Sequence, residues 1–187
     1  MKKDLLLVID MQNVYGQGGA WSCHQAGGAA ENIKKLIREG GDSINVIFTR
    51  FLSDEEAEGA WKDYNRENAD INKDVFANRM MEAFGEELKH YPLYTKSVYS
   101  SLAIPEVKRA VKDADRVLLA GVVAECCVLS TAFAAIDEGS RIVYLRDCVS
   151  GLDEDTEKAT ETVLSGLVPV QVNIMTSEEY LRRKDHG

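Results

Sequence analysis

Three side chains with the chemistry of a base, a cation and a nucleophile each follow an apolar stretch of the sequence. Asp10 comes directly after the run Leu5–Ile9, Lys96 closes a shorter run, and Cys127 follows a third. A carboxylate in that position is costly to bury unless it borders a pocket or pairs with a cation. Lys96 could be that cation and would keep Asp10 ionised. The combination predicts acyl transfer through a cysteine nucleophile.

Each of these residues also has a simpler interpretation. Asp10 could cap a helix or turn, Lys96 could be a solvated lysine, and Cys127 could be a small buried hydrophobe. A thiol at a helix N-terminus, however, has its thiolate stabilised by the helix dipole, and free amides there could hold an oxyanion. Because the three residues come from three strand ends, we favour the functional interpretation.

The elements that must position these residues are strands alternating with helices. Strands are predicted at Leu5–Ile9, Ile44–Phe48, Leu93–Lys96, Val117–Val123, Ile142–Leu145 and Val168–Val172, and helices at 29–39, 105–111, 127–138, 153–164 and 177–183. The longest runs are continuous, as in strands covered on both faces. The pattern predicts an α/β fold: a Rossmann-like, doubly wound, mostly parallel six-stranded sheet with helices on both faces. Right-handed crossovers then place the carboxyl ends of the strands along one edge, where ligands bind.

Several local signals refine the helices. Gly40 and Gly41 are a plausible C-cap, and Pro105 can take the first position of its helix. The helix at 127–138 is small and apolar nearly all round, so we expect it to be buried. Thr176 and Glu179 have the spacing of a capping box, although a cap at Ser177 is equally compatible.

The stretch 53–90 departs from the alternation. It is polar, contains Trp61, Tyr64 and Phe76, and is predicted to form helical pieces of a lid or an oligomer contact. The chain 1–187 is otherwise predicted to be a single domain with this insertion.

Composition excludes several classes of function. A net charge of −9 over 187 residues argues against nucleic-acid and anionic-membrane partners. The first apolar run is too short for a membrane span, and no signal-like cleavage site follows it. Four cysteines are too few for a disulfide scaffold, which predicts a reduced, cytoplasmic protein. The histidines have no metal-ligand spacing, so a structural zinc site is not expected. The histidines are His24, His90 and His186, and the cysteines interpreted as structural are Cys23, Cys126 and Cys148.

Three motifs give the chain a family resemblance. They are Asp10-Met-Gln-Asn-Val-Tyr15, Lys96-Ser-Val-Tyr-Ser-Ser-Leu102 and Gly121-Val-Val-Ala-Glu-Cys-Cys127-Val128. In their order and spacing, residues 5–172 resemble the isochorismatase-like cysteine hydrolases, which include nicotinamidases and N-carbamoylsarcosine amidases.

The resemblance implies a catalytic triad of Asp10, Lys96 and Cys127, because the family register selects Cys127 over Cys126. It also implies a cis peptide between Val122 and Val123, and an oxyanion hole formed by the backbone amides of Val123 and Cys127. The implied reaction is hydrolysis of an amide, ureido or carbamoyl C–N bond of a small molecule through a thioester, with no cofactor.

The chain departs from the family pattern at three places. Ala124 replaces the usual Thr, Leu102 replaces the usual Phe, and the stretch Thr49-Arg50-Phe51-Leu52 lacks the Asp-x-His of metal-dependent nicotinamidases. We therefore expect no metal. Isochorismate-cleaving relatives lack the cysteine nucleophile, so Cys127 favours acyl transfer. An ether hydrolase of that type and a catalytically silent ligand-binding or assembly protein are the alternatives.

The substrate side of the site is predicted from position alone. Tyr15, Arg50, Trp61 and Tyr99 follow strand ends or lie in the insertion. Arg50 would suit a carboxylate or another anionic group, but it could equally form a structural ion pair, and Trp61 could be a packing residue. Relatives of this fold commonly form dimers or tetramers, so a homo-oligomer is expected.

Overall fold

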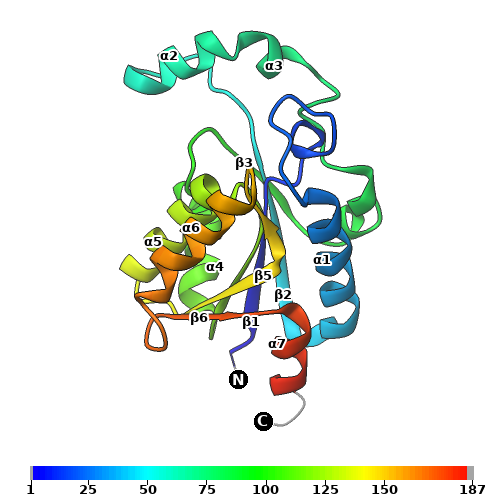
Figure 1. Ribbon diagram of the computed structural model, residues 1–187, viewed down its shortest axis with the longest axis vertical. Coiled ribbons are helices and arrows are strands. Elements are labelled where there is room, and N and C mark those ends of the chain that lie inside the picture. The colour runs from blue at the N-terminus through cyan, green and yellow to red at the C-terminus, as the bar shows by residue number, and fades with distance from the viewer. Residues whose placement is uncertain (1, 185–187) are drawn as a thin grey trace.

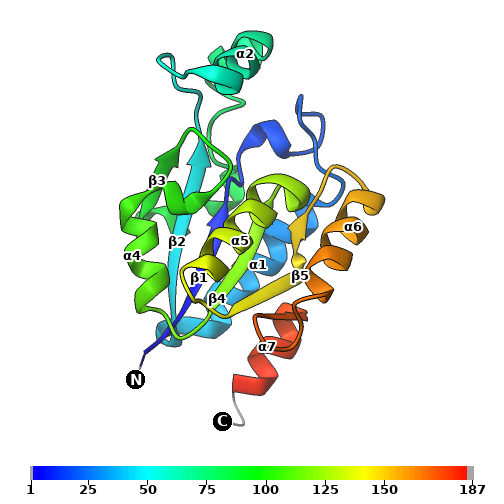
Figure 2. The ribbon, with the colours of Figure 1, turned by 90° about the vertical axis from the view of Figure 1, so that its left-hand side faces the viewer.

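A parallel sheet organises the protein. The computed structural model describes residues 2–184, and within them six strands lie in the order β3-β2-β1-β4-β5-β6. Figure 1 shows the sheet between its helices, and Figure 2 shows the order from β3 to β5. The strands are β1 (Asp4–Ile9), β2 (Ile44–Phe51), β3 (Leu93–Lys96), β4 (Val117–Val122), β5 (Ile142–Ser150) and β6 (Val172–Met175). Every neighbouring pair is parallel. The predicted doubly wound α/β fold is confirmed.

Helices cover both faces of this sheet. In Figures 1 and 2, α1 and α7 lie on one face, and α4, α5 and α6 lie on the other. The helices are α1 (Ala26–Gly40), α2 (Gly59–Glu67), α3 (Ala69–Lys73), α4 (Pro105–Asp113), α5 (Leu129–Asp137), α6 (Glu154–Ser165) and α7 (Ser177–Lys184).

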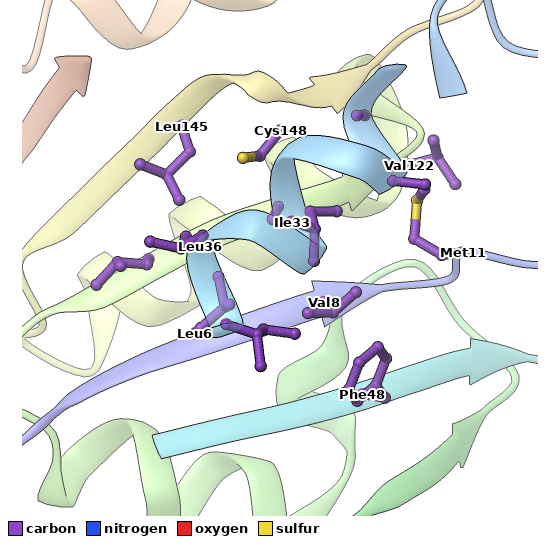
Figure 3. Close-up of a cluster of buried hydrophobic side chains, with 14 of the residues drawn as sticks. Leu6, Val8, Met11, Ile33, Leu36, Phe48, Val122, Leu145 and Cys148 are labelled. Atoms are coloured by element: carbon purple, nitrogen blue, oxygen red, sulfur yellow. The ribbon is translucent and has the colours of Figure 1, made fainter. Parts of the chain in front are cut away.

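The alternation of side chains along β1 joins the three layers. Leu6 and Val8 pack with Ile33 and Leu36 of α1 (Figure 3). The intervening residues of β1 point to the opposite face and join the cluster formed by α4, α5 and α6. All of these side chains are buried, and each contributes roughly 1.5–3 kcal/mol of hydrophobic stabilisation. The continuous apolar run therefore reflects burial on both faces.

Strand register brings the predicted site residues to one edge of the sheet. Ile9, the last residue of β1, pairs with Thr49 on β2 and with Gly121 on β4. Phe51 of β2 pairs with Lys96 on β3. The carboxyl ends of these four strands are therefore side by side.

The insertion is tied to the body at its C-terminal side. Asn13 N–H donates to the Arg79 carbonyl, Met81 N–H donates to the Met11 carbonyl, and residues 12 and 80 form an antiparallel bridge. Helix α2, by contrast, stands beyond the carboxyl ends of the strands (Figures 1 and 2) and contains no buried residue. The predicted lid or interface role of this segment stays a prediction, as does the single-domain assignment.

Three local predictions fail. The last strand lies at Val172–Met175 and not at 168–172, because the residues before Val172 form turns around Pro169, which has no N–H to donate. Cys127 lies within a π-helical turn, Ala124–Val128, that precedes α5. The expected burial of α5 on all sides is also wrong: Phe133 is 40% exposed, because only one face of this outer helix can meet the sheet.

Other local predictions are confirmed. Pro105 begins α4. Thr176 and Glu179 form the capping box, since each side chain bonds to the other's backbone N–H, whereas the Ser177 hydroxyl bonds to Asp147.

Residues 2–184 contain no candidate membrane-spanning helix and no candidate metal-binding cluster. No helix in this range has the length and apolar character that crossing a bilayer requires. Nor does this range contain a group of three His, Cys, Asp or Glu side chains placed to hold a metal ion. His186 lies outside the described residues.

Candidate active site

Asp10, Lys96 and Cys127 meet at the sheet edge in a closed cluster. The Lys96 ammonium donates to Asp10 Oδ2 at 2.5 Å and lies 3.6 Å from Cys127 Sγ. It also donates to the Val98 carbonyl at 3.1 Å. The Asp10 and Lys96 side chains are fully buried, and Cys127 is 3% exposed. The structure thus brings together the three residues that the sequence singled out.

The environment of Cys127 favours the protonated thiol. Burial raises its pKa, and the charge of Asp10 and a hydrogen bond to that carboxylate raise it further. Lys96 and a backbone hydrogen bond from Val123 act in the opposite direction but do not prevail. The stabilisation of the thiolate expected from the helix end and from Lys96 is thus present but is outweighed by the burial of the thiol.

Lys96 keeps its charge in this enclosed position. Burial by itself lowers the pKa of Lys96, but the nearby Asp10 and Cys127 raise it above its ordinary value overall. The ammonium therefore balances the one buried carboxylate of the cluster. This is the arrangement that makes a buried charge tolerable.

The backbone around Asp10 has an unusual shape. Asp10 has a φ of +53°, a left-handed conformation that few non-glycine residues adopt. Opposite it, Gly121 has a φ of +109°, and a Cβ at this position would collide with the Ile9 carbonyl. Close approach of β1 and β4 therefore requires glycine at 121, and it brings the loop that carries Cys127 beside Asp10.

Two buried polar side chains that the sequence analysis did not select lie near Asp10, and one of them bonds to its carboxylate. The Thr49 hydroxyl donates to Asp10 Oδ1 at 2.9 Å. Gln12 is buried, and its amide accepts from Phe51 N–H and donates to the carbonyls of Phe51 and Asn78. Gln12 lies within the motif that begins at Asp10, and this position was a sequence signal that Gln12 belongs to the site. Thr49 had no such signal, because its partner is fixed by strand register.

The loop between β4 and the π-helical turn matches what the resemblance implies. The peptide between Val122 and Val123 is cis. Ala124, which replaces the usual Thr, is fully buried in the core cluster shared with α4, α5 and α6. The oxyanion-hole role of the Val123 and Cys127 amides stays a prediction.

Aromatic rings cover this cluster. The Trp61 ring of α2 lies 4.8 Å from the Tyr99 ring and 6.0 Å from Phe51. The Tyr15 ring lies 5.8 Å from the Trp21 ring, which in turn lies 6.5 Å from Phe51. The predicted Tyr15, Trp61 and Tyr99 therefore belong to one wall.

Sequence reasoning missed a central member of that wall. Tyr64 contacts Trp61 with ring centroids 5.4 Å apart and also contacts Phe51 and Trp21. Burial, then Tyr99 and Cys127, raise the pKa of Tyr64 to about 12. Its position three residues after Trp61, on the same face of a helix, was the available signal.

Arg50 is placed differently from the other candidates. Its Nε donates to the Thr95 hydroxyl at 2.9 Å on the neighbouring strand β3. Thr49 and Phe51, on either side of it, reach Asp10 and Lys96. Because side chains alternate along a strand, Arg50 points to the other face. The structure does not bring it to the triad.

The isochorismatase domain model matches residues 4–179, nearly the whole chain. The chain belongs to the isochorismatase family. The resemblance stated from the three motifs is confirmed, and with it membership of a family of hydrolases.

Several solved structures share the fold. A cysteine hydrolase from Pseudomonas syringae pv. phaseolicola 1448A gives a TM-score of 0.82 at 18% identity, covering 98% of this chain and 93% of that one. An isochorismatase-like hydrolase from Alkaliphilus metalliredigens gives 0.76 at 20% identity, covering 97% and 99%. A pyrazinamidase/nicotinamidase from Streptococcus mutans UA159 gives 0.73 at 18% identity, covering 91% and 100%. None of the curated protein sequences compared with the chain matches it.

Proposed function

We propose that this protein is a cysteine hydrolase that cleaves the C–N bond of a small amide, ureido or carbamoyl compound. The observation that carries the proposal is the buried cluster in which Lys96 Nζ lies 2.5 Å from Asp10 Oδ2 and 3.6 Å from Cys127 Sγ. A protein that only binds a ligand has no need of a nucleophile, a base and a cation in contact.

The first half of the reaction forms a thioester. Asp10 takes the proton of the Cys127 thiol, and the sulfur attacks the substrate carbonyl carbon. Backbone amides of Val123 and Cys127 stabilise the oxyanion, each such donor being worth about 3–4 kcal/mol. When the tetrahedral intermediate collapses, the C–N bond breaks and protonated Asp10 gives its proton to the leaving amine.

The second half restores the enzyme. Asp10, again a carboxylate, takes a proton from a water that attacks the thioester carbonyl. The C–S bond then breaks, the acid leaves, and Cys127 recovers its proton from Asp10. Lys96 stays an ammonium throughout and keeps the carboxylate ionised between proton transfers.

The wall over the triad supports a compact substrate. We assign Tyr15, Trp61 and Tyr99 as substrate contacts and add Tyr64, since these rings form one cluster around Phe51, whose ring lies against the Lys96 ammonium. Rings of this kind favour a flat or apolar group beside the reacting carbonyl. Arg50 is not assigned, because its guanidinium bonds to Thr95.

The test is ammonia release from a panel of pyridine carboxamides, ureido acids and carbamoyl amines. Cys127→Ala is expected to abolish turnover, and Cys126→Ala, the matched control one residue away, is expected to retain it. An acyl adduct on Cys127 seen by intact mass would support the thioester. Full turnover by Cys127→Ala on a confirmed substrate would disprove the nucleophile assignment. A Cys127 thiol that stays inert to alkylation at every pH, even in the Trp61→Ala variant, would favour the silent ligand-binding alternative.

A further inference from the structure

The hydroxyl of Thr49 holds the carboxylate that serves as the base. Thr49 Oγ1 donates to Asp10 Oδ1 at 2.9 Å, and both residues are 0% exposed. The Thr49 carbonyl also accepts the Asp10 backbone N–H at 3.0 Å. One residue of β2 therefore binds Asp10 at its backbone and at its side chain.

This contact fixes the rotation of the carboxylate. With Oδ1 bonded to Thr49, Oδ2 faces the Lys96 ammonium at 2.5 Å. Rotation about the Cβ–Cγ bond would break both contacts at once. Because the site is buried, bulk water cannot replace the lost donor. The hydroxyl thus keeps the base in the orientation in which it receives the hydrogen bond of the Cys127 thiol.

We propose that Thr49 is a positioning residue that orients Asp10 for proton transfer from Cys127. It touches neither the substrate nor the sulfur and acts only through the carboxylate. The inference rests on the proposed function, since it assigns a role within that reaction. Among the described residues, Thr49 is the one whose hydroxyl donates to Asp10 Oδ1.

Loss of the hydroxyl has a defined chemical consequence. The titratable groups that face Asp10 are Lys96 from β3, Cys127 from the π-helical turn and Tyr15 from the turn after β1. All of them remain in a Thr49 variant. Removing the hydroxyl donor leaves Oδ1 without this bond and frees the carboxylate to rotate, so proton transfer from Cys127 should slow.

The experiment compares Thr49→Val with Thr49→Ser. Valine keeps the volume and β-branching without the hydroxyl, and serine restores the hydroxyl. The rate of Cys127 alkylation by iodoacetamide is followed from pH 5 to 9 by mass spectrometry, with fragment ions separating Cys127 from Cys126. Thr131→Val is the matched control, because Thr131 is equally buried but bonds to Ser101, away from Asp10.

The expected result separates positioning from packing. Thr49→Val should alkylate about 10- to 100-fold more slowly at pH 7. Thr49→Ser should lie within about 3-fold of the wild type, and Thr131→Val should keep the wild-type profile. If Thr49→Val does not fold, Thr49→Ala, which also lacks the hydroxyl, takes its place.

Two outcomes would overturn the proposal: a valine or alanine variant with the wild-type profile, or a serine variant as slow as the valine variant. Failure of the proposed function has a different signature, a Cys127 that does not react at any pH, even in the Trp61→Ala variant. Turnover of a substrate found in the panel gives a second readout, in which Thr49→Val should lower kcat and leave KM nearly unchanged.

Discussion

Replacing Lys96 by methionine tests the electrostatics of the site through stability. The change removes the ammonium that contacts Asp10 Oδ2, the Val98 carbonyl and Cys127 Sγ, while the two side chains of the ion pair are fully buried. Asp10 is left as a buried charge with no cation, which costs about 3–5 kcal/mol. In a protein of this size 1 kcal/mol corresponds to about 2–4 °C, so Tm should fall by about 10 °C.

A double-mutant cycle distinguishes the ion pair from general packing. Asp10→Asn alone should also destabilise the protein, because it leaves a buried ammonium. The double variant Asp10→Asn/Lys96→Met removes both charges and should be more stable than Lys96→Met alone, with a coupling energy of about 3 kcal/mol. Urea unfolding followed by circular dichroism gives the four free energies.

An exposed pair of nearly equal length provides the control. Lys89 Nζ lies 2.6 Å from Glu86 Oε1, but the two side chains are 63% and 80% exposed. Lys89→Met should therefore change stability little. If the losses from Asp10→Asn and Lys96→Met simply add, or if Lys96→Met costs no more than Lys89→Met, the reasoning from burial is refuted.

Three further predictions concern the thiol, the sheet edge and the aromatic wall. Because the pKa of Cys127 is raised above its ordinary value of 9.0, the folded protein binds the thiol proton more tightly than the unfolded chain. Stability relative to Cys127→Ala should then fall above pH 9 by up to about 1.4 kcal/mol per pH unit, measured by urea unfolding; a pH-independent difference would contradict this. Gly121→Ala should cost about 3 kcal/mol or more in thermal or urea unfolding, since its Cβ would meet the Ile9 carbonyl; the comparison is Gly27→Ala, where the Cβ meets open space. Trp61→Ala should speed alkylation of Cys127 several-fold by uncovering it, and an unchanged rate would show that Trp61 does not limit access.

Much of the fold was predictable from the sequence because burial on both faces leaves a continuous apolar run. The run before Asp10 and the run from Val117 were identified for this reason. The last strand was misplaced because the apolar residues around Pro169 look like a strand, while backbone hydrogen bonding places them in turns. Apolar character gives the amount of burial, but it does not give the conformation.

The site was predictable as far as topology decides it. Carboxyl ends of parallel strands share one edge, so Asp10, Lys96 and Cys127 had to be neighbours once the sheet was known. The direction of the thiol pKa was not predictable, because it depends on how completely the site is enclosed. The contact from Thr49 and the outward direction of Arg50 were not predictable either. Both depend on which face of β2 each side chain takes, and a shift of one residue would exchange them.

The burial of Cys127 predicts that α2 moves away from the body when a substrate binds. Cys127 is 3% exposed, so a substrate reaches the sulfur only if part of the cover moves. Helix α2 buries no residue and contacts the body through the rings of Trp61 and Tyr64, which meet Tyr99, Phe51 and Trp21. Each ring pair is worth about 0.5–1.5 kcal/mol beyond the area it buries. Separating these few pairs would cost a few kcal/mol, so we predict an open state of α2 populated at about 0.1–10%. On this prediction, the ring contacts hold α2 over the body and are still weak enough to admit a substrate.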